Sequence, residues 1–273
     1  MLNKQHRSKA RDDHSYARLS PFFRGRPLTD IKRADVRAYI RHRQLQGVKI
    51  STVRRELRLF SAAVNYSSLE LELDLPNPAR ALGLVEPEGR VRWITQGEAS
   101  RLVREAGHYA RTPHLQQFIR LALNTGCRKT ELMRLEWSRV DLARAIFVLE
   151  AEHTKAGKRR SVALNAGAVS ALRAMRTWCN ESCPYTRWVF SQPTGKPVTT
   201  FKTGWRGACN RAGIHDFRIH DLRHTCASWL VMSGVSLTVV RDVLGHSSIA
   251  VTERYAHLAP DLLREAVAML PDF

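Results

Sequence analysis

The stretch His220-Asp221-Leu222-Arg223-His224-Thr225 decides how the rest of this chain is interpreted. It pairs a histidine with an arginine three residues later. Upstream, an arginine follows a glycine in Leu123-Asn124-Thr125-Gly126-Cys127-Arg128-Lys129-Thr130-Glu131-Leu132-Met133-Arg134-Leu135-Glu136-Trp137. Downstream, Leu244-Gly245-His246 is followed by Thr252-Glu253-Arg254-Tyr255, so that a tyrosine stands nine residues after the histidine. The interpretation depends on these pieces occurring together and in this order.

Together the three stretches resemble the two signature boxes of the tyrosine recombinase, or phage integrase, family, over residues 92–273. The resemblance implies a site-specific DNA recombinase that cleaves and rejoins duplex DNA through a 3′-phosphotyrosine intermediate. Integration, excision, dimer resolution and inversion all use this chemistry, and the sequence does not separate them. Tyr255 would be the nucleophile, and Glu131 would brace Arg128 as the family's acidic residue does.

The same resemblance assigns the other roles in the pocket. Arg128 and Arg223 would hold the non-bridging oxygens of the scissile phosphate, and His220 and His246 would complete the site. Lys155, in a predicted hairpin turn, would protonate the leaving 5′-oxygen. Lys158, across the same turn, is a rival for that role. The predicted catalytic set is Arg128, Lys155, His220, Arg223, His246 and Tyr255, with His224 left as a structural residue.

Physical chemistry supports these residue types independently. Attack on a phosphodiester builds negative charge on the phosphate oxygens, and preorganised cationic donors stabilise that charge. Arginine is suited to this because its planar fork binds two oxygens and keeps its charge. A histidine near neutrality can accept the phenol proton of a tyrosine. The sequence holds no acidic cluster of the kind that binds two Mg²⁺ ions, so we expect no metal and no cofactor.

The charge balance predicts a polyanionic partner, double-stranded DNA. The 273 residues include 44 Lys plus Arg against 25 Asp plus Glu, a formal charge of +19. Both parts are basic, with 17 basic and 10 acidic side chains up to residue 88, and 27 and 15 beyond it. No stretch approaches the roughly 20 apolar residues of a membrane span, and the first residues lack a signal peptide's apolar core. We therefore expect a cytoplasmic protein with five reduced, structural cysteines.

Residues 1–85 are predicted to form a helical bundle that binds DNA. Thr29 is expected to cap a helix running to about Gln46, and Ser51 the next one. An earlier helical segment is expected between His6 and Leu19. On the second capped helix, apolar residues recur at helical spacing and basic residues lie off that stripe. The predicted DNA contacts are Lys49, Thr52, Arg54, Arg55 and Arg58; the alternative is a solvated helix face.

The predicted fold class is mainly α (α+β), with a linker at 86–91 and a mixed α/β catalytic domain at 92–273. Thr95 and Glu98 form a capping-box pair, and Thr112-Pro113 should begin a helix that ends near Gly126. Residues 146–149 and 160–164 read as a hairpin around a turn at 155–158. Residues 188–190 read as a further short strand. The catalytic domain should therefore carry a small antiparallel sheet.

The tail after Tyr255 predicts how protomers assemble. One helical stripe is formed by Leu258, Leu262, Leu263, Ala266, Val267 and Leu270. In recombinases of this family such a helix docks on a neighbouring protomer, so we expect a monomer in solution and a tetramer on paired DNA sites; the alternative is a helix packed on its own domain. Two rival functions are a type IB topoisomerase-like enzyme and a DNA-binding relative without catalysis. The little chain before residue 5 favours a two-domain system.

Overall fold

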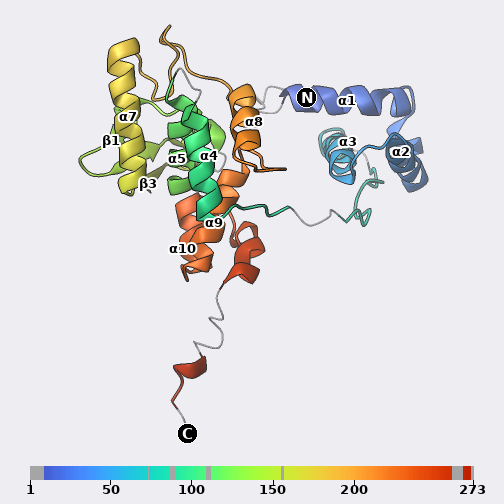
Figure 1. Ribbon diagram of the computed structural model, residues 1–273. Coiled ribbons are helices and arrows are strands. Elements are labelled where there is room, and N and C mark those ends of the chain that lie inside the picture. The colour runs from blue at the N-terminus through green and yellow to red at the C-terminus, as the bar shows by residue number, and fades with distance from the viewer. Residues whose placement is uncertain are drawn as a thin grey trace. The chain divides into compact units, whose positions relative to one another are not determined.

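This computed structural model describes residues 9–72, 74–85, 90–108, 112–154, 157–259 and 267–271. The chain divides into two compact units between Gly89 and Arg90. Helices dominate both, and a single three-stranded antiparallel sheet lies in the second unit of the described chain (Figure 1). The predicted fold class, mainly α with a small antiparallel sheet, is confirmed.

The first unit is built from α1 (Lys9–Phe23), α2 (Arg33–Leu45) and α3 (Ile50–Glu70), with a 3₁₀ turn at Leu28–Asp30. Its core is formed by the apolar faces of the three helices. The residues at its centre are Leu19, Phe23, Ile31, Val36, Tyr39, Ile40, Val53, Leu57, Phe60 and Val64. The apolar stripe predicted for the third helix therefore faces the core.

Two predicted helix starts in the first unit are wrong by a few residues. The first helix continues to Phe23, past the predicted end at Leu19, and the predicted start at His6 lies outside the described residues. Thr29 lies in the 3₁₀ turn, where its hydroxyl donates to the neighbouring Asp30 instead of capping a helix. The helix is capped at Lys32, three residues later, where the Asp35 carboxylate accepts the backbone N–H of Lys32 at 2.8 Å. The next helix includes Ser51 and begins at Ile50.

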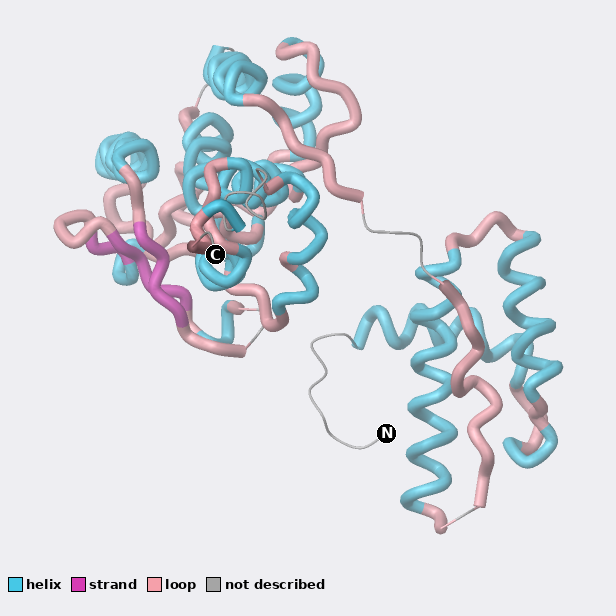
Figure 2. The backbone as a smooth tube through the Cα atoms, turned by 90° about the horizontal axis from the view of Figure 1, so that it is seen from below, coloured by secondary structure: helices cyan, strands magenta, loops and turns pink. Residues whose placement is uncertain are grey.

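The second unit places a three-stranded sheet beside a set of helices. Strands β1 (Val140–Asp141), β2 (Ile146–Leu149) and β3 (Arg160–Ala163) pair in that order. Phe147 lies opposite Val162 in the register. Figure 2 draws the strands in magenta among the helices of the unit. The predicted hairpin is thus present. Residues 188–190 do not form a strand, because Trp188 makes only an isolated bridge to Glu136.

Helix α5 lies at the centre of the second unit and packs against α4, α7 and α9. Its residues are almost all buried, including Phe118, Ile119 and Leu121. The helices of this unit are α4 (Gln96–His108), α5 (His114–Thr125), α6 (Lys129–Met133), α7 (Ala166–Ser182), α8 (Lys202–Arg211), α9 (Asp221–Met232) and α10 (Leu237–Leu244). Short 3₁₀ segments follow at Ile249–Val251 (η4) and Glu253–Leu258 (η5), and others lie at Trp137–Arg139 and Ala151–His153.

Gly126 ends α5 and sets the direction of the chain toward Arg128. Its φ of +61° is in the left-handed region that favours glycine. A Cβ here would lie 2.3 Å from Leu244 Cδ2 and 3.1 Å from Cys226 Sγ, so the turn packs against both α9 and α10. The glycine before the first arginine is therefore required by conformation and by packing.

Candidate active site

Arg128 stands immediately before α6 and is held by the glutamate three residues later. Its Nη1 donates to Glu131 Oε1 at 2.7 Å, and its backbone N–H donates to Glu131 Oε2 at 2.8 Å. Its Nη2 reaches the carbonyl oxygen of Gly245 at 3.3 Å. Glu131 is only 1% exposed, so its charge is available to the arginines that surround it. The expectation that Glu131 braces the first arginine agrees with this geometry.

Arg223 lies on α9 and is 4% exposed. Its Nη1 donates to the carbonyl oxygen of Gly126 at 2.8 Å, which ties α9 to the turn before Arg128. Its Nη2 is buried and has no hydrogen-bond partner among the described residues. Burial, together with the nearby Arg128, lowers the pKa of Arg223 to about 10. A buried cationic donor without a partner is a site that an anion would satisfy.

His220 and His246 are both held in uncharged form by their surroundings. His220 precedes α9, and burial followed by the charge of Arg223 lowers its pKa. His246 follows the left-handed Gly245 that ends α10, and its Nδ1 lies 2.8 Å from the hydroxyl of the fully buried Thr252. Burial and Arg223 lower the pKa of His246 to about 3. Near neutral pH both rings can therefore accept or donate hydrogen bonds without adding charge.

Tyr255 lies in η5 and is 1% exposed. Its hydroxyl is 2.5 Å from Nδ1 of His224 on α9. Burial raises the pKa of Tyr255 to about 12, and burial followed by the neighbouring His220 lowers the pKa of His224 to about 4. At these pKa values the Tyr255 phenol keeps its proton and donates a hydrogen bond to the neutral imidazole of His224. In the free protein the nucleophile predicted from the sequence is therefore protonated, shielded and hydrogen-bonded.

Sequence reasoning missed His224 and Arg160 as members of this cluster. His224 stands four residues after His220 on α9, and the two rings meet edge to face with centroids 5.1 Å apart. That i,i+4 spacing could have indicated a shared helix face. Arg160 opens β3, and its Nη2 lies 3.2 Å from Glu131 Oε2. The alternating pattern of the strand gave no sign of this contact.

Lys155 lies outside the described residues, so its predicted role stays a prediction. The described part of the turn is closed by Thr154, whose hydroxyl donates to the carbonyl oxygen of Lys158 at 2.9 Å. Its oxygen also accepts the backbone N–H of Lys158 at 3.1 Å. Lys158 is exposed.

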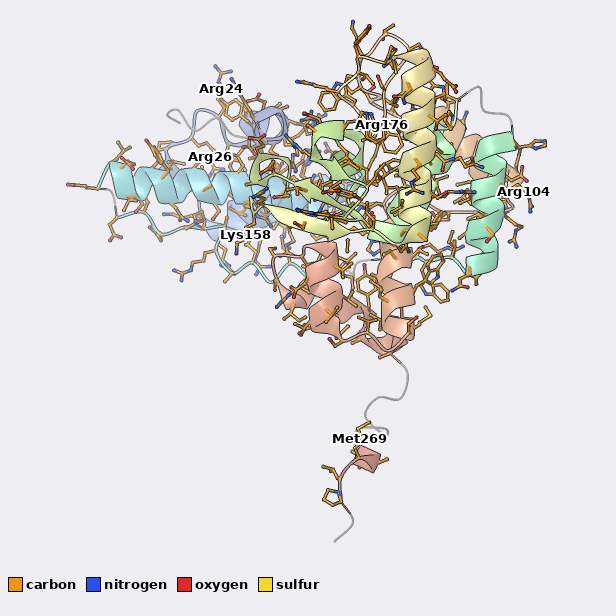
Figure 3. All side chains as sticks on the ribbon, turned by 90° about the vertical axis from the view of Figure 1, so that its left-hand side faces the viewer. Arg24, Arg26, Arg104, Lys158, Arg176 and Met269 are labelled. Carbon is orange, nitrogen blue, oxygen red and sulfur yellow. The ribbon has the colours of Figure 1, made fainter. Side chains whose placement is uncertain are left out.

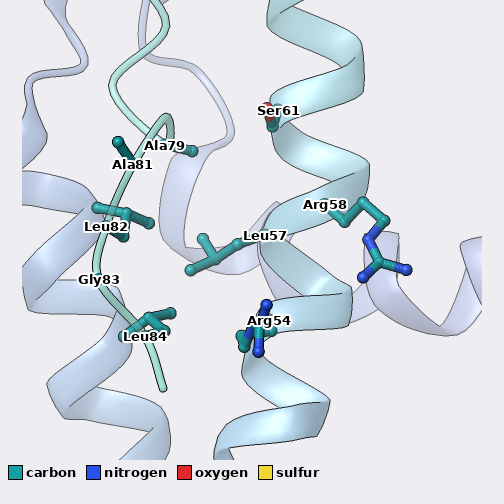
Figure 4. Close-up of a pocket in the computed structure, with 9 residues that line it drawn as sticks. All are labelled: Arg54, Leu57, Arg58, Ser61, Ala79, Ala81, Leu82, Gly83 and Leu84. Atoms are coloured by element: carbon teal, nitrogen blue, oxygen red, sulfur yellow. The ribbon is translucent and has the colours of Figure 1, made fainter. Parts of the chain in front are cut away.

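The predicted DNA contacts of the first unit lie on or just before α3. Lys49, Arg55 and Arg58 are exposed, whereas Thr52 and Arg54 are half-buried. Arg54 and Arg58 line a cavity of about 360 Å³ between α3 and the segment around Leu82, and Figure 4 shows both arginines on the helix beside Leu57. Exposed cations also stand elsewhere on both units, such as Arg24, Arg26, Arg104 and Lys158 in Figure 3.

The described residues contain neither a metal-binding cluster nor a membrane-spanning helix. No group of three or more His, Cys, Asp or Glu side chains there could hold a metal ion. No helix in the described ranges is long and apolar enough to cross a membrane.

The sequence pattern of the phage integrase family matches residues 92–261. The chain belongs to the phage integrase family. Within the family, the integrase of Salmonella phage P22 is 36% identical over 210 residues, which cover 72% of this chain and 51% of that protein. The tyrosine recombinase XerD of Rhizobium meliloti (strain 1021) is 31% identical over 259 residues, 89% of this chain and 82% of that protein. The chain thus spans about half the length of the P22 integrase.

Solved structures share the fold. The integrase of the Tn1549 transposon, in complex with transposon right end DNA, matches with a TM-score of 0.80 at 17% identity, over 97% of this chain and 94% of that chain. The catalytic domain of the bacteriophage HP1 integrase matches with a TM-score of 0.51 at 27% identity, over 67% of this chain and 96% of that chain.

Proposed function

We propose that this protein is a site-specific DNA recombinase that cuts and rejoins duplex DNA through a covalent link to Tyr255. The observation that carries the proposal is the convergence of Arg128, Arg223 and His246 where the turns at Gly126 and Gly245 adjoin, with a buried Arg223 nitrogen that has no partner in the described chain. A phosphodiester oxygen is the partner that such a donor lacks. The family membership of residues 92–261 supports the same chemistry.

In the proposed reaction, arginines stabilise the negative charge, and a histidine and a lysine transfer the protons. Arg128 and Arg223 bind the non-bridging oxygens, and their hydrogen bonds strengthen as negative charge develops on them. The Tyr255 oxygen attacks phosphorus, the bond to the 5′-oxygen breaks, and a 3′-phosphotyrosine forms. A neutral histidine accepts the phenol proton, and Lys155 supplies the proton for the leaving oxygen. Rejoining reverses these steps, so the bond energy is kept in the phosphotyrosine link.

The proposed partner is double-stranded DNA, contacted by both basic units in the manner of a clamp. The predicted contacts on the first unit are Lys49, Thr52, Arg54, Arg55 and Arg58. Strand exchange between duplexes needs several protomers, and we propose a monomer in solution and a tetramer on paired sites. The proposed contact between protomers is the apolar helical stripe that follows Tyr255. Its residues 262, 263 and 266 lie outside the described residues. Action on DNA also places the proposed activity in the cytoplasm.

The test begins by finding a substrate. Nicked duplexes with a randomised segment are incubated with the protein, and those that become covalently attached are recovered and sequenced; the best is called the captured duplex. Wild-type protein should form adducts that survive denaturation. Tyr255→Phe should bind the captured duplex with unchanged affinity and form none, whereas Tyr66→Phe, a control at a partly exposed tyrosine, should match wild type.

The outcomes separate the alternatives. Adducts that persist in Tyr255→Phe would disprove the assignment of the nucleophile. Adducts with relaxation of a supercoiled plasmid, but no exchange between two captured sites, would favour a type IB topoisomerase-like enzyme. A wild-type protein that binds DNA and captures no duplex would be a non-catalytic DNA-binding relative.

A further inference from the structure

Arg160 connects three segments of the second unit that converge on the site. It begins β3, and its Nη1 donates to the carbonyl oxygen of Val243 near the end of α10 at 2.9 Å. Its Nη2 lies 3.2 Å from Glu131 Oε2 and 3.5 Å from Cys127 Sγ. The side chain is 16% exposed, so these contacts are largely shielded from water. One guanidinium thus joins the sheet to both the Arg128 turn and the His246 turn.

Gly245 shows how closely Arg160 fits this turn. The glycine has a φ of +66°, and a Cβ there would lie 2.6 Å from Arg160 Nε and 2.9 Å from Arg160 Cδ. Its carbonyl oxygen accepts from Arg128 Nη2 at 3.3 Å. The residue before His246 is therefore held between two arginines, and a displacement of Arg160 would move the turn that carries His246.

The charges in the cluster suggest why an additional arginine is useful. Glu131 is buried and contacts both Arg128 and Arg160 through ion pairs. If Arg160 balances the charge of Glu131, then Arg128 and Arg223 remain uncompensated. The transition state of phenolate attack on a diester carries about two negative charges, which two uncompensated guanidiniums match. Without Arg160, Glu131 would instead neutralise Arg128.

We propose that Arg160 is a positioning residue: it neutralises and orients Glu131 and fixes the Gly245 turn, so that Arg128 and His246 meet the scissile phosphate correctly charged and aligned. This inference rests on the proposed recombinase function and deepens it. Arg160 itself contacts no substrate in this scheme, because its Nη1 is engaged by the Val243 carbonyl and its Nη2 by Glu131 and Cys127. Its effect should therefore appear in the rate of cleavage and not in DNA affinity.

The experiment measures single-turnover adduct formation and equilibrium binding with the captured duplex. Arg160→Gln should cleave about 10- to 100-fold more slowly, as expected when reacting groups are misplaced, with affinity within about threefold of wild type. Arg160→Lys keeps the cation and should recover part of the rate. Arg159→Ala is the matched control, because Arg159 is the preceding residue, its side chain is 69% exposed, and it forms an ion pair with the half-exposed Glu150. This variant should cleave at the wild-type rate.

A second measurement separates charge positioning from loss of structure. A methylphosphonate at the scissile position replaces a charged oxygen with a neutral methyl group, so cleavage should depend less on the arginines. The defect of Arg160→Gln should shrink several-fold on this substrate. In a double-mutant cycle, Glu131→Gln combined with Arg160→Gln should lose less rate than the two single losses combined, because both variants break the same Glu131–Arg160 ion pair.

The outcomes also separate this inference from the function on which it rests. Wild-type protein that forms no adduct would contradict the proposed function. If wild-type protein cleaves DNA but Arg160→Gln and Arg160→Lys cleave at the same rate as each other, the proposed role of Arg160 is wrong. A defect of equal size on phosphate and methylphosphonate would also overturn it, since Arg160 would then act only on the fold.

Discussion

Each unit of the molecule buries a glutamate against arginine side chains, but the two networks differ in their balance of charge. In the first unit Glu56, 1% exposed, accepts from Arg43 Nε at 3.0 Å, Arg43 Nη2 at 2.7 Å and the Tyr39 hydroxyl at 2.8 Å. One cation meets one anion there. In the second unit Glu131 contacts Arg128 and Arg160, with Arg223 beside them.

The difference distinguishes a structural network from one prepared for a ligand. Each guanidinium nitrogen of Arg43 is hydrogen-bonded, since Nε and Nη2 bond Glu56 and Nη1 bonds Gln46. In the second unit, Arg223 Nη2 is buried without a partner among the described residues. A closed, neutral network stabilises a fold, whereas an open, cationic one costs stability and is retained for an anion.

The largest effect is expected from opening the closed network. Arg43→Leu leaves the Glu56 carboxylate buried without its cation and should cost about 3–5 kcal/mol of stability. Urea unfolding can locate the loss, because all six tryptophans lie after residue 89 and report on the second unit alone. Far-UV circular dichroism should show an early transition that tryptophan fluorescence does not. Arg55→Leu, at an exposed position of α3, is the control; coincident transitions in Arg43→Leu would contradict the account.

Removing a cation from the open network should lower the cleavage rate and spare stability, which is the reverse of the effect expected for Arg43→Leu. Arg223→Gln should raise the activation free energy for cleavage of the captured duplex by about 3–4 kcal/mol, because one preorganised donor is lost. Stability of the second unit should stay the same or rise, because burial already disfavours the charge of Arg223, whose pKa is lowered to about 10. Arg223→Lys should recover little, since lysine lacks the planar fork. Equal losses of binding and cleavage would instead indicate simple phosphate binding.

Acid should destabilise the second unit through its histidines. The pKa of His224 is lowered to about 4, so the unfolded chain binds a proton more readily than the folded one between pH 4 and about 6.5. Stability from this group is therefore complete above pH 6.5 and is lost as the pH falls toward 4, by on the order of 2 kcal/mol. His224→Asn, which keeps an acceptor near the Nδ1 position but does not titrate, should flatten the tryptophan-detected acid dependence. An unchanged dependence would refute the assignment.

The smallest effect is expected from exposed cations, which belong to neither network. Arg55→Ala and Arg58→Ala should each lower the slope of log affinity against log salt by about 0.9 if each contacts a phosphate. The rate of adduct formation at saturating DNA should not change. The control is Arg144→Ala, an 80% exposed arginine in the turn between β1 and β2. Unchanged slopes in the α3 variants would identify this surface as a solvated helix face.

The sequence predicted what depends on local pattern and on the family motif. The mainly α class and the hairpin around residues 146–163 follow from periodicity and turn residues, and both are present. Helix starts were less predictable, because α2 is capped at Lys32, which is not a preferred N-cap residue, with the Asp35 carboxylate closing the cap from the third helical position. The His224–Tyr255 and Arg160–Glu131 contacts were missed because their partners are 31 and 29 positions apart. No local pattern encodes such a pairing.

The shielding of Tyr255 has a consequence for the cell that carries this gene. A protein that links itself covalently to DNA at random would leave broken strands across a chromosome, and its basic surface would take it to every duplex it met. With its phenol 1% exposed and hydrogen-bonded to His224, the free protein can search DNA as a chemically inert ligand. If Tyr255 is the nucleophile, as proposed, cleavage requires a conformational step that exposes it, and mutations that make this step easier would be selected against even where they speed the reaction.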